Sequence, residues 1–168
     1  MSLGDVKIIS GGVANVISFP VDDRTTSSQT ETIKAGEPVQ VDNENYVEIV
    51  VDGGPVQTGA NHFVGVAHNE SSETSSAEGV VEVEQIIPNY TVLRAKATTP
   101  ANIDTAAELL AIRGDAVTFD NASNVITIDE NEGDDPNVHG LVIVGGNIDR
   151  GTIDFIVKPL ATLFGRSV

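Results

Sequence analysis

Residues 115–158 read DAVTFDNASNVITIDENEGDDPNVHGLVIVGGNIDRGTIDFIVK, and this stretch decides the fold. Its apolar runs are short, rich in Val and Ile, and bounded by Gly, Asn, Asp and Pro, which is the pattern of β-strands. In the last run, Ile153, Phe155 and Val157 fall on one face, and mostly polar residues fall on the other. Such alternation is typical of a half-buried strand. The stretch therefore predicts a small antiparallel sheet.

More strand-like runs precede this stretch, separated by turns rich in Gly, Pro, Asn and Asp. They are residues 39–41, 46–51, 63–67, 80–87 and 90–97. Short strands at close spacing, punctuated by turns, favour a barrel or a sandwich. We therefore expect a mainly β fold, made of small antiparallel barrel or sandwich lobes with one short α-helix.

The helix is expected near residues 104–113. Thr105 and Glu108 fit a capping box, in which the Thr hydroxyl and the Glu carboxylate each accept a hydrogen bond from the other residue's free backbone N–H. Arg113 suits the negative end of the helix dipole, and Gly114 suits the left-handed residue that ends a helix. The apolar face consists of Leu109, Leu110 and Ile112. A helix this short depends on packing for its stability.

Four segments follow from these patterns. We expect an N-terminal arm and linker (1–32), a β-barrel-like lobe (33–98), a helix plus a small antiparallel sheet (99–158) and a C-terminal tail (159–168). The apolar residues before position 21 either join a sheet or lie on a neighbouring chain. The tail is expected to dock as a strand or to act as a contact arm. The helix is expected between two β-rich lobes.

The composition argues against several classes of partner. The 168 residues include 25 Asp and Glu against 9 Lys and Arg, so the net charge is −16. Such a surface repels phosphate backbones and anionic lipids, and we expect neither a nucleic-acid nor a membrane partner. No apolar stretch approaches the roughly 20 residues that span a bilayer. The chain has no Cys and only 4% aromatic residues, so Val, Ile, Leu and Ala must build the core.

The acidic stretch DENEGDD at residues 129–135 is the one candidate metal site. A calcium loop of the EF-hand type needs Gly at its sixth position, Glu at its twelfth and a helix on each side. Counted from Asp129, Gly133 is fifth and Gly140 is twelfth, and the flanks are strand-like. Two alternatives remain: a solvated acidic turn, or a weak calcium site of another type built from Asp129, Asp134 and Asp135.

The three histidines indicate no catalytic or metal site. His62, His68 and His139 do not have the spacing of a zinc motif, and there is no Cys to join them. Motifs of serine hydrolases and nucleotide-binding loops are also missing from the sequence. We therefore expect a protein that is not an enzyme, with no catalytic residues and no cofactor.

Several motifs resemble a known family. The order of IKAGEPV at residues 33–39, FVGVA at 63–67 and GVVEV at 79–83 resembles that of small capsid decoration (cement) proteins of tailed bacteriophages. The second half, with GDAVTFD at 114–120 and DDPNVHGLVIVGG at 134–146, is similar to modules of phage virion structural proteins. The resemblance covers most of the chain beyond residue 32 and carries over no catalytic residue.

The resemblance implies a location and a partner. It implies a non-enzymatic protein, made in the host cytoplasm, that binds the outer capsid surface of the virion and bridges subunits of the major capsid protein. It also implies a homo-oligomer, usually a trimer. Two other functions stay open. One is another virion component, such as a tail tube or a head fibre. The other is a carbohydrate-binding or adhesin β module, either with or without a calcium requirement.

Overall fold

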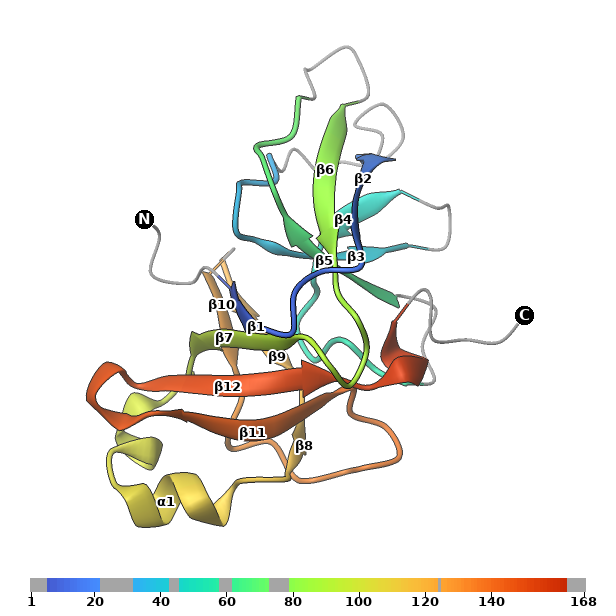
Figure 1. The fold of residues 1–168 in the computed structure, drawn as a ribbon. Helices are drawn as coiled ribbons and strands as arrows, with labels where there is room; N and C mark the ends of the chain where they lie inside the picture. The colour runs from blue at the N-terminus through green and yellow to red at the C-terminus, as the bar shows by residue number, and fades with distance from the viewer. Residues whose placement is uncertain are drawn as a thin grey trace.

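A computed structural model of the chain describes residues 6–21, 32–42, 46–57, 62–72, 79–123 and 125–162. The fold is mainly β, with antiparallel sheets stacked in a sandwich-like arrangement, and this confirms the fold class predicted from the sequence. Figure 1 shows the first of these sheets (β2 to β6) above the second, with strands β9 and β10 behind the lower sheet and helix α1 at the lower end.

The first sheet contains five strands in the order β2-β6-β5-β3-β4, and all neighbours are antiparallel. Its strands are β2 (Asn15–Pro20), β3 (Pro38–Val41), β4 (Val47–Ile49), β5 (His62–Ala67) and β6 (Val80–Gln85). A parallel bridge joins Val21 to Val47, so the chain just after β2 lies against the opposite edge strand. The sheet must therefore curl until its two edges meet at this point.

The second five-stranded sheet has the order β1-β7-β12-β11-β8 and is also antiparallel. Its strands are β1 (Lys7–Ser10), β7 (Val92–Lys96), β8 (Ala116–Val117), β11 (Leu141–Asn147) and β12 (Thr152–Val157). Strands β9 (Phe119–Ala122) and β10 (Val125–Ile128) pair only with each other. Residues 115–158, which were predicted to form a sheet of their own, therefore supply three strands (β8, β11 and β12) to the second sheet. They also form the separate β9–β10 hairpin.

Two segments pair with strands other than those that their positions in the sequence led us to expect. Strand β7, expected in the 33–98 lobe, is bonded to β1 and β12 of the second sheet. Residues 7–20, expected within an arm and linker, supply β1 to the second sheet and β2 to the first. The chain thus passes between the sheets after β1 and again after β6. The linker at 22–31 and the end of the tail at 163–168 lie outside the described residues.

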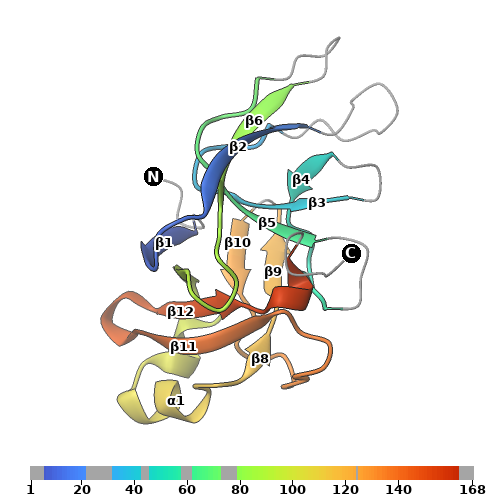
Figure 2. The same ribbon diagram turned by 45° about the vertical axis from the view of Figure 1, so that its right-hand side comes forward.

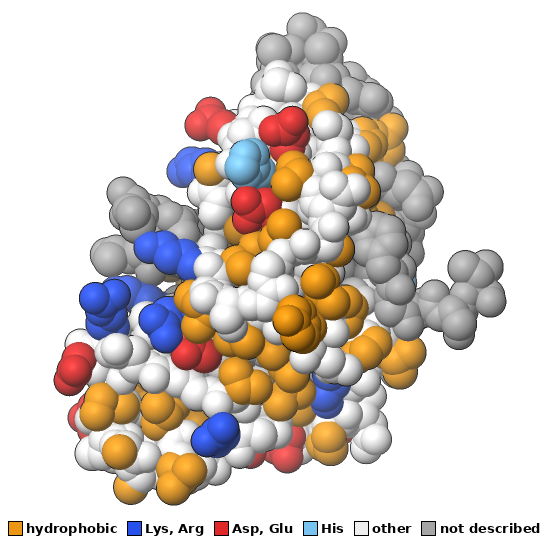
Figure 3. All heavy atoms as spheres, in the orientation of Figure 1, with side chains coloured by type: hydrophobic (Ala, Val, Ile, Leu, Met, Phe, Trp, Pro, Cys, Tyr) orange, Lys and Arg blue, Asp and Glu red, His pale blue; other side chains and the backbone are white. Residues whose placement is uncertain are grey.

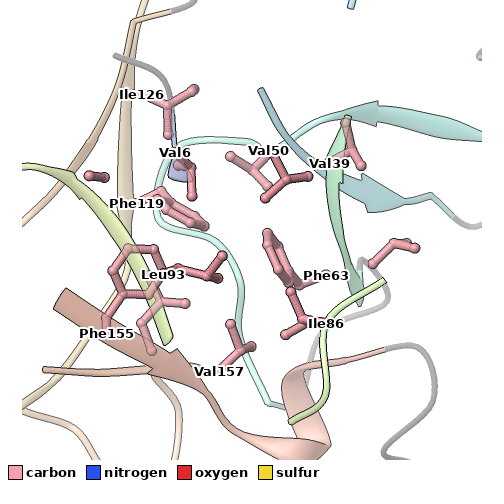
Figure 4. Packing of buried hydrophobic residues seen from close by; sticks show 14 of the residues in the cluster. Val6, Val39, Val50, Phe63, Ile86, Leu93, Phe119, Ile126, Phe155 and Val157 are labelled. Carbon is pink, nitrogen blue, oxygen red and sulfur yellow. The ribbon is translucent and has the colours of Figure 1, made fainter. Parts of the chain in front are cut away.

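A single apolar core joins the sheets. Phe63 on β5, Phe119 on β9 and Phe155 on β12 are all fully buried, and each belongs to a different sheet. The ring centroids of Phe63 and Phe119 are 5.9 Å apart, and those of Phe119 and Phe155 are 5.5 Å apart with an edge-to-face arrangement. Figure 4 shows these rings among Val, Ile and Leu side chains from both sheets. As the composition predicted, branched aliphatic residues form most of this core.

Helical segments are few and short. Helix α1 spans Ala106–Ala111, inside the predicted range, and Thr105 forms the predicted capping box with Glu108. Three 3-10 helices, η1 (Pro100–Ile103), η2 (Ile148–Arg150) and η3 (Pro159–Ala161), complete the helical part of the described residues. Helix α1 contacts β11 and lies beyond the second sheet, and not between the sheets as expected (Figures 1 and 2).

Candidate functional site

The aspartates of the candidate calcium loop accept hydrogen bonds from backbone N–H groups of the loop region and of strand β8. Asp129, Asp134 and Asp135 each accept a hydrogen bond from a different backbone N–H, those of Asn131, Ala116 and Asn137 respectively. The three carboxylates therefore bind three different backbone groups and do not share one partner. Among the described residues, no group of three or more His, Cys, Asp or Glu side chains could hold a metal ion. The loop is thus built as a structured turn in this conformation.

A buried carboxylate ties the start of the loop to the segment before α1. Glu130 is only 7% exposed. Its oxygens accept hydrogen bonds from the Thr99 backbone N–H at 3.1 Å and from the Asn102 side-chain amide at 3.1 Å. The neighbouring Asn131 amide donates to the same carboxylate at 2.9 Å. Buried charges are stable only when hydrogen-bonded in this way, so Glu130 acts as a clamp between the loop and η1.

His139 closes the other end of the loop. Its Nδ1 lies 2.9 Å from the Ala116 carbonyl oxygen, and its Nε2 lies 3.3 Å from a Glu132 carboxylate oxygen. The second Glu132 oxygen accepts a short hydrogen bond from the Thr118 hydroxyl. The imidazole therefore joins the acidic loop, through Glu132, to strand β8, through the carbonyl of Ala116.

Two further charges sit at the base of the loop. Burial, and then the nearby Asp134 charge, raise the pKa of the Asp115 carboxyl above its ordinary value. Burial lowers the pKa of the Lys158 amine, although Asp134 and Asp135 oppose this effect. The Lys158 ammonium donates a hydrogen bond to the Pro136 carbonyl at 2.8 Å. The hydrogen bond from Lys158 fixes the loop to the residue that follows β12.

The other histidines lie elsewhere. His62 is the first residue of β5, whereas His68 follows the end of that strand. The His68 Nδ1 lies 2.9 Å from a Glu84 carboxylate oxygen at an exposed position on the first sheet. His139 is in the loop described above, so the structure does not gather the three imidazoles into one site.

A groove of about 420 Å³ lies between α1 and the end of the β11–β12 hairpin. It is lined by Ala106, Leu109, Leu110 and Arg113 of the helix region and by residues 145–149. Leu110 is 68% exposed, and no residue of α1 is buried. The lining is mainly apolar, with Arg113 and Asp149 as its charged members. It has the chemistry of a socket for an apolar group.

Sequence reasoning did not find this groove. It identified Leu109, Leu110 and Ile112 as an apolar helix face and expected the helix to depend on packing for its stability. The missing signal was Gly145-Gly146, where the pairing of β11 with β12 shifts register after Ile143. A Cβ on Gly146 would overlap the Thr152 carbonyl oxygen of the hairpin and would lie 3.1 Å from Leu109, so the glycine allows both the close pairing of the hairpin and the approach of the helix. Gly145 has nothing within 4 Å of the place a Cβ would take, and the groove opens there.

Comparisons with known proteins supply no family assignment. No family model, curated protein or solved structure matches the chain. Within the part of the chain that the structure describes, no helix has the length and apolar character required to cross a bilayer.

Proposed function

We propose that this protein is a non-enzymatic capsid decoration, or cement, protein. It binds the outer surface of a tailed-phage head as a homo-oligomer, a trimer by the resemblance, and bridges subunits of the major capsid protein. Internal DNA pressure pushes those subunits apart, and a small oligomer that holds several of them raises the cost of separation. Each contact can be modest, because simultaneous engagement multiplies the affinity.

The motifs that carry the resemblance support the proposal by their positions. FVGVA at residues 63–67 forms most of β5, GVVEV at 79–83 runs into β6, and IKAGEPV at 33–39 leads into β3. Strands β3, β5 and β6 are adjacent in the first sheet. The three motifs therefore belong to one structural unit, as a shared family pattern requires.

The single observation that carries the proposal is the exposed apolar end of the molecule at α1. A six-residue helix is not stable by itself in water, yet none of the residues of α1 is buried. Leu110 and Ile148 instead remain 68% and 37% exposed at the groove. A second protein that fills the groove would bury these side chains and complete the packing of the helix. In the proposal, that protein is the major capsid protein.

The test uses heads assembled without this protein, to which the purified chain is added. Wild-type protein is expected to co-sediment with the heads and to raise the temperature at which they release DNA. Leu110→Gln should lose both effects, because it removes the apolar contact and adds no charge. Ala107→Gln is the matched control: it also lies exposed on α1, does not line the groove, and has the same helix propensity after substitution.

Two outcomes would redirect the proposal. If wild-type protein does not bind expanded heads, the decoration function is wrong. If electron micrographs show the purified chain as stacked rings or filaments, a tail-tube or head-fibre component becomes the better assignment. Equal binding by the Leu110→Gln and Ala107→Gln variants would leave the function in place and remove the groove as its contact.

A further inference from the structure

Strand β11 has a neighbouring strand on both sides only in its first half. Strand β12 pairs with it from Leu141 to Asn147, whereas β8 pairs only with Leu141 and Val142 among the described residues. Figures 1 and 2 both show α1 on the side of β11 opposite β12. The groove at α1 is therefore bounded by the edge of a sheet as well as by a helix. An edge strand presents backbone groups that a further strand can bind.

Gly146 turns its backbone N–H and carbonyl towards this edge. The Ile143 N–H donates to the Asp115 carbonyl at 3.1 Å, and the Ile143 carbonyl accepts from the Gly114 N–H at 2.8 Å, so both groups of Ile143 point away from β12. Successive residues of an antiparallel strand point their backbone groups to opposite sides, and the register shift after Ile143 inserts one extra residue. Gly146 thus has the same orientation as Ile143, but no strand of the described chain lies beside it on that side.

Apolar surface lies next to the backbone of Gly146. Direct partners on adjacent strands share a face, so a residue paired with Gly146 would direct its side chain to the face where Leu109 lies, 3.1 Å from a Cβ placed on Gly146. Leu110 and Ile148 also line the groove and are 68% and 37% exposed. In Figure 3, hydrophobic side chains gather at the lower left, over this end of the molecule. A side chain of an added strand would therefore meet an apolar surface.

The groove carries opposite charges at its two ends. Arg113 lies in the turn after α1, one residue before Gly114, which binds the middle of β11 at Ile143. Asp149 lies in η2, beyond the last residue of β11. Both side chains are exposed, and in the described part of the chain neither has an ion-pair partner. A bound segment is therefore oriented by a positive group at one end of the groove and a negative group at the other.

We propose that the groove binds an extended segment of a partner protein, which adds to the edge of β11 as a strand. One residue of the segment forms two backbone hydrogen bonds with Gly146, and its aliphatic side chain packs on Leu109 and Leu110. All strand pairs of the described sheets are antiparallel, so the segment is antiparallel to β11 and runs from Asp149 towards Arg113. A basic residue then precedes the aliphatic one, and an acidic residue follows it.

This inference rests on the proposed function for the identity of the partner, which is the major capsid protein. It adds the form and the chemistry of the segment that is bound. Main-chain hydrogen bonds to a sheet edge supply affinity irrespective of sequence, and the aliphatic and charged side chains supply the specificity. Because the open edge is short and has charges at its ends, it discriminates against other strands.

The first experiment needs only the purified full chain and a synthetic peptide, acetyl-Thr-Lys-Thr-Leu-Thr-Glu-Thr-amide, as the probe. An NMR titration follows the amide signals of the protein. We expect saturable binding with a dissociation constant of about 1 mM or lower, the range of a single weak contact. Shifts should centre on α1 and residues 145–149, and the Gly146 amide should exchange more slowly with solvent when peptide is bound. No saturable binding, or shifts centred elsewhere, would overturn the proposal.

Methyl groups on the peptide backbone separate strand addition from a purely apolar contact. A methyl on the Leu nitrogen removes the N–H that donates to the Gly146 carbonyl, and it should raise the dissociation constant about tenfold. A methyl on the nitrogen of the following Thr is the matched control. That N–H points away from β11, so the affinity should stay within about twofold of the parent peptide. Equal affinities of the two methylated peptides would rule out strand addition.

A charge reversal tests the direction of the segment. Arg113→Glu should raise the dissociation constant about fivefold, and a peptide with Lys in place of Glu should recover most of the affinity for this variant. Lys34→Glu is the control, since it makes the same charge change at an exposed residue in the turn before β3, away from the groove. Circular dichroism checks that both variants fold. An equal loss in the control, or no recovery with the Lys peptide, would overturn the assigned direction.

Binding to heads assembled without this protein distinguishes the inference from the proposed function. If the chain binds heads, an excess of the peptide should compete with them. Head binding without such competition would mean that the proposed function holds and that strand addition is wrong. Peptide binding that depends on the Leu N–H, together with no head binding, would mean that the groove recognises extended segments and that the decoration function is wrong.

Discussion

The two five-stranded sheets are alike in size but are assembled from the chain in different ways. In the first sheet, β3, β4, β5 and β6 follow one another along the chain, and β2 adds at one edge. In the second sheet, β1 and β7 are more than 80 residues apart, as the pairing of Ile8 with Leu93 shows. Pairings between distant segments have a high cost in loop-closure entropy.

The difference shows how the sheets depend on each other. All of the first sheet lies between β1 and β7 in sequence, so the second sheet completes its edge only when the first brings those strands together. The buried side chain of Phe119 contacts a ring from each sheet. We therefore expect the sheets to unfold together as one cooperative unit, and the predictions below test this expectation in order of effect size.

The largest effect should come from Phe119→Ala. Removal of a fully buried ring that contacts Phe63 and Phe155 should lower the free energy of unfolding by about 3 to 5 kcal/mol. The measurement is urea denaturation followed by circular dichroism and by hydrogen exchange of amides in both sheets. Protection should fall in both sheets alike. Val125→Ala is the control, since that side chain is 48% exposed on the adjacent strand β10.

A different result would show that the two sheets unfold independently. If the Phe119→Ala variant unfolds in two steps, with one sheet keeping its wild-type protection, the sheets are independent and the comparison above is wrong. The wild-type chain should in any case show one transition with the same midpoint for both sets of amides.

The second prediction places the same small substitution in each sheet. A Cβ on Gly65 of β5 would overlap the Glu84 carbonyl of β6, a backbone atom that cannot move without parting the strands. Gly65→Ala should therefore cost about 1 to 3 kcal/mol. Gly145→Ala in β11 should change the stability by less than about 0.5 kcal/mol, because nothing lies within 4 Å of its Cβ. Thermal denaturation of both variants measures the difference, and equal losses would contradict the close approach at Gly65.

Local patterns in the sequence predicted the elements well. The capping box was readable because Thr105 and Glu108 stand three residues apart before an apolar run, and both its hydrogen bonds are present. The strands were readable because β-branched runs end at Gly, Asn or Pro. In β12, Ile153, Phe155 and Val157 are buried, as the alternation predicted.

Pairing partners and surface features were not readable in the same way. Nothing local in the run at residues 90–97 tells that β7 bonds to β12, which lies some 60 residues further on, as the pair Arg94 and Asp154 shows. The apolar face of the helix was also readable, but its local pattern does not tell that Leu110 stays 68% exposed. The groove depends on such long-range neighbours, which a single sequence does not specify.

The third prediction concerns the ion pair that is particular to the second sheet. The Asp154 carboxylate accepts both hydrogen bonds from Arg94, and these bonds raise the pKa of the Arg94 guanidinium. Asp154→Asn should lower the free energy of unfolding by about 1 to 2 kcal/mol, because Arg94 then faces Lys7 without a compensating charge. Asp149→Asn, at an exposed turn, should have almost no effect. Urea denaturation at low and high salt measures both, and a stability equal to wild type would show that this pair contributes nothing to the sheet.

The smallest effect has the opposite sign and depends on pH. Burial and the Asp134 charge raise the pKa of Asp115 in the folded protein, so folding favours the protonated carboxyl. That contribution to stability is fully present below the ordinary Asp pKa of about 3.9, and it is lost as pH rises through the raised folded pKa. Asp115→Asn removes the charge, and it should therefore stabilise the protein by about 0.5 kcal/mol near neutral pH.

The gain from Asp115→Asn should shrink as pH falls, because the wild-type carboxyl then also becomes neutral. Melting temperatures of wild type and variant from about pH 4 to about pH 8 give the profile, with Asp149→Asn as a control that should follow wild type throughout. A variant that is less stable than wild type near neutral pH would mean that the Asp115 carboxylate stabilises the fold. The junction between β8 and the acidic loop would then depend on the negative charge of Asp115. Asp115 would no longer differ from Asp154, whose negative charge is expected to stabilise the fold.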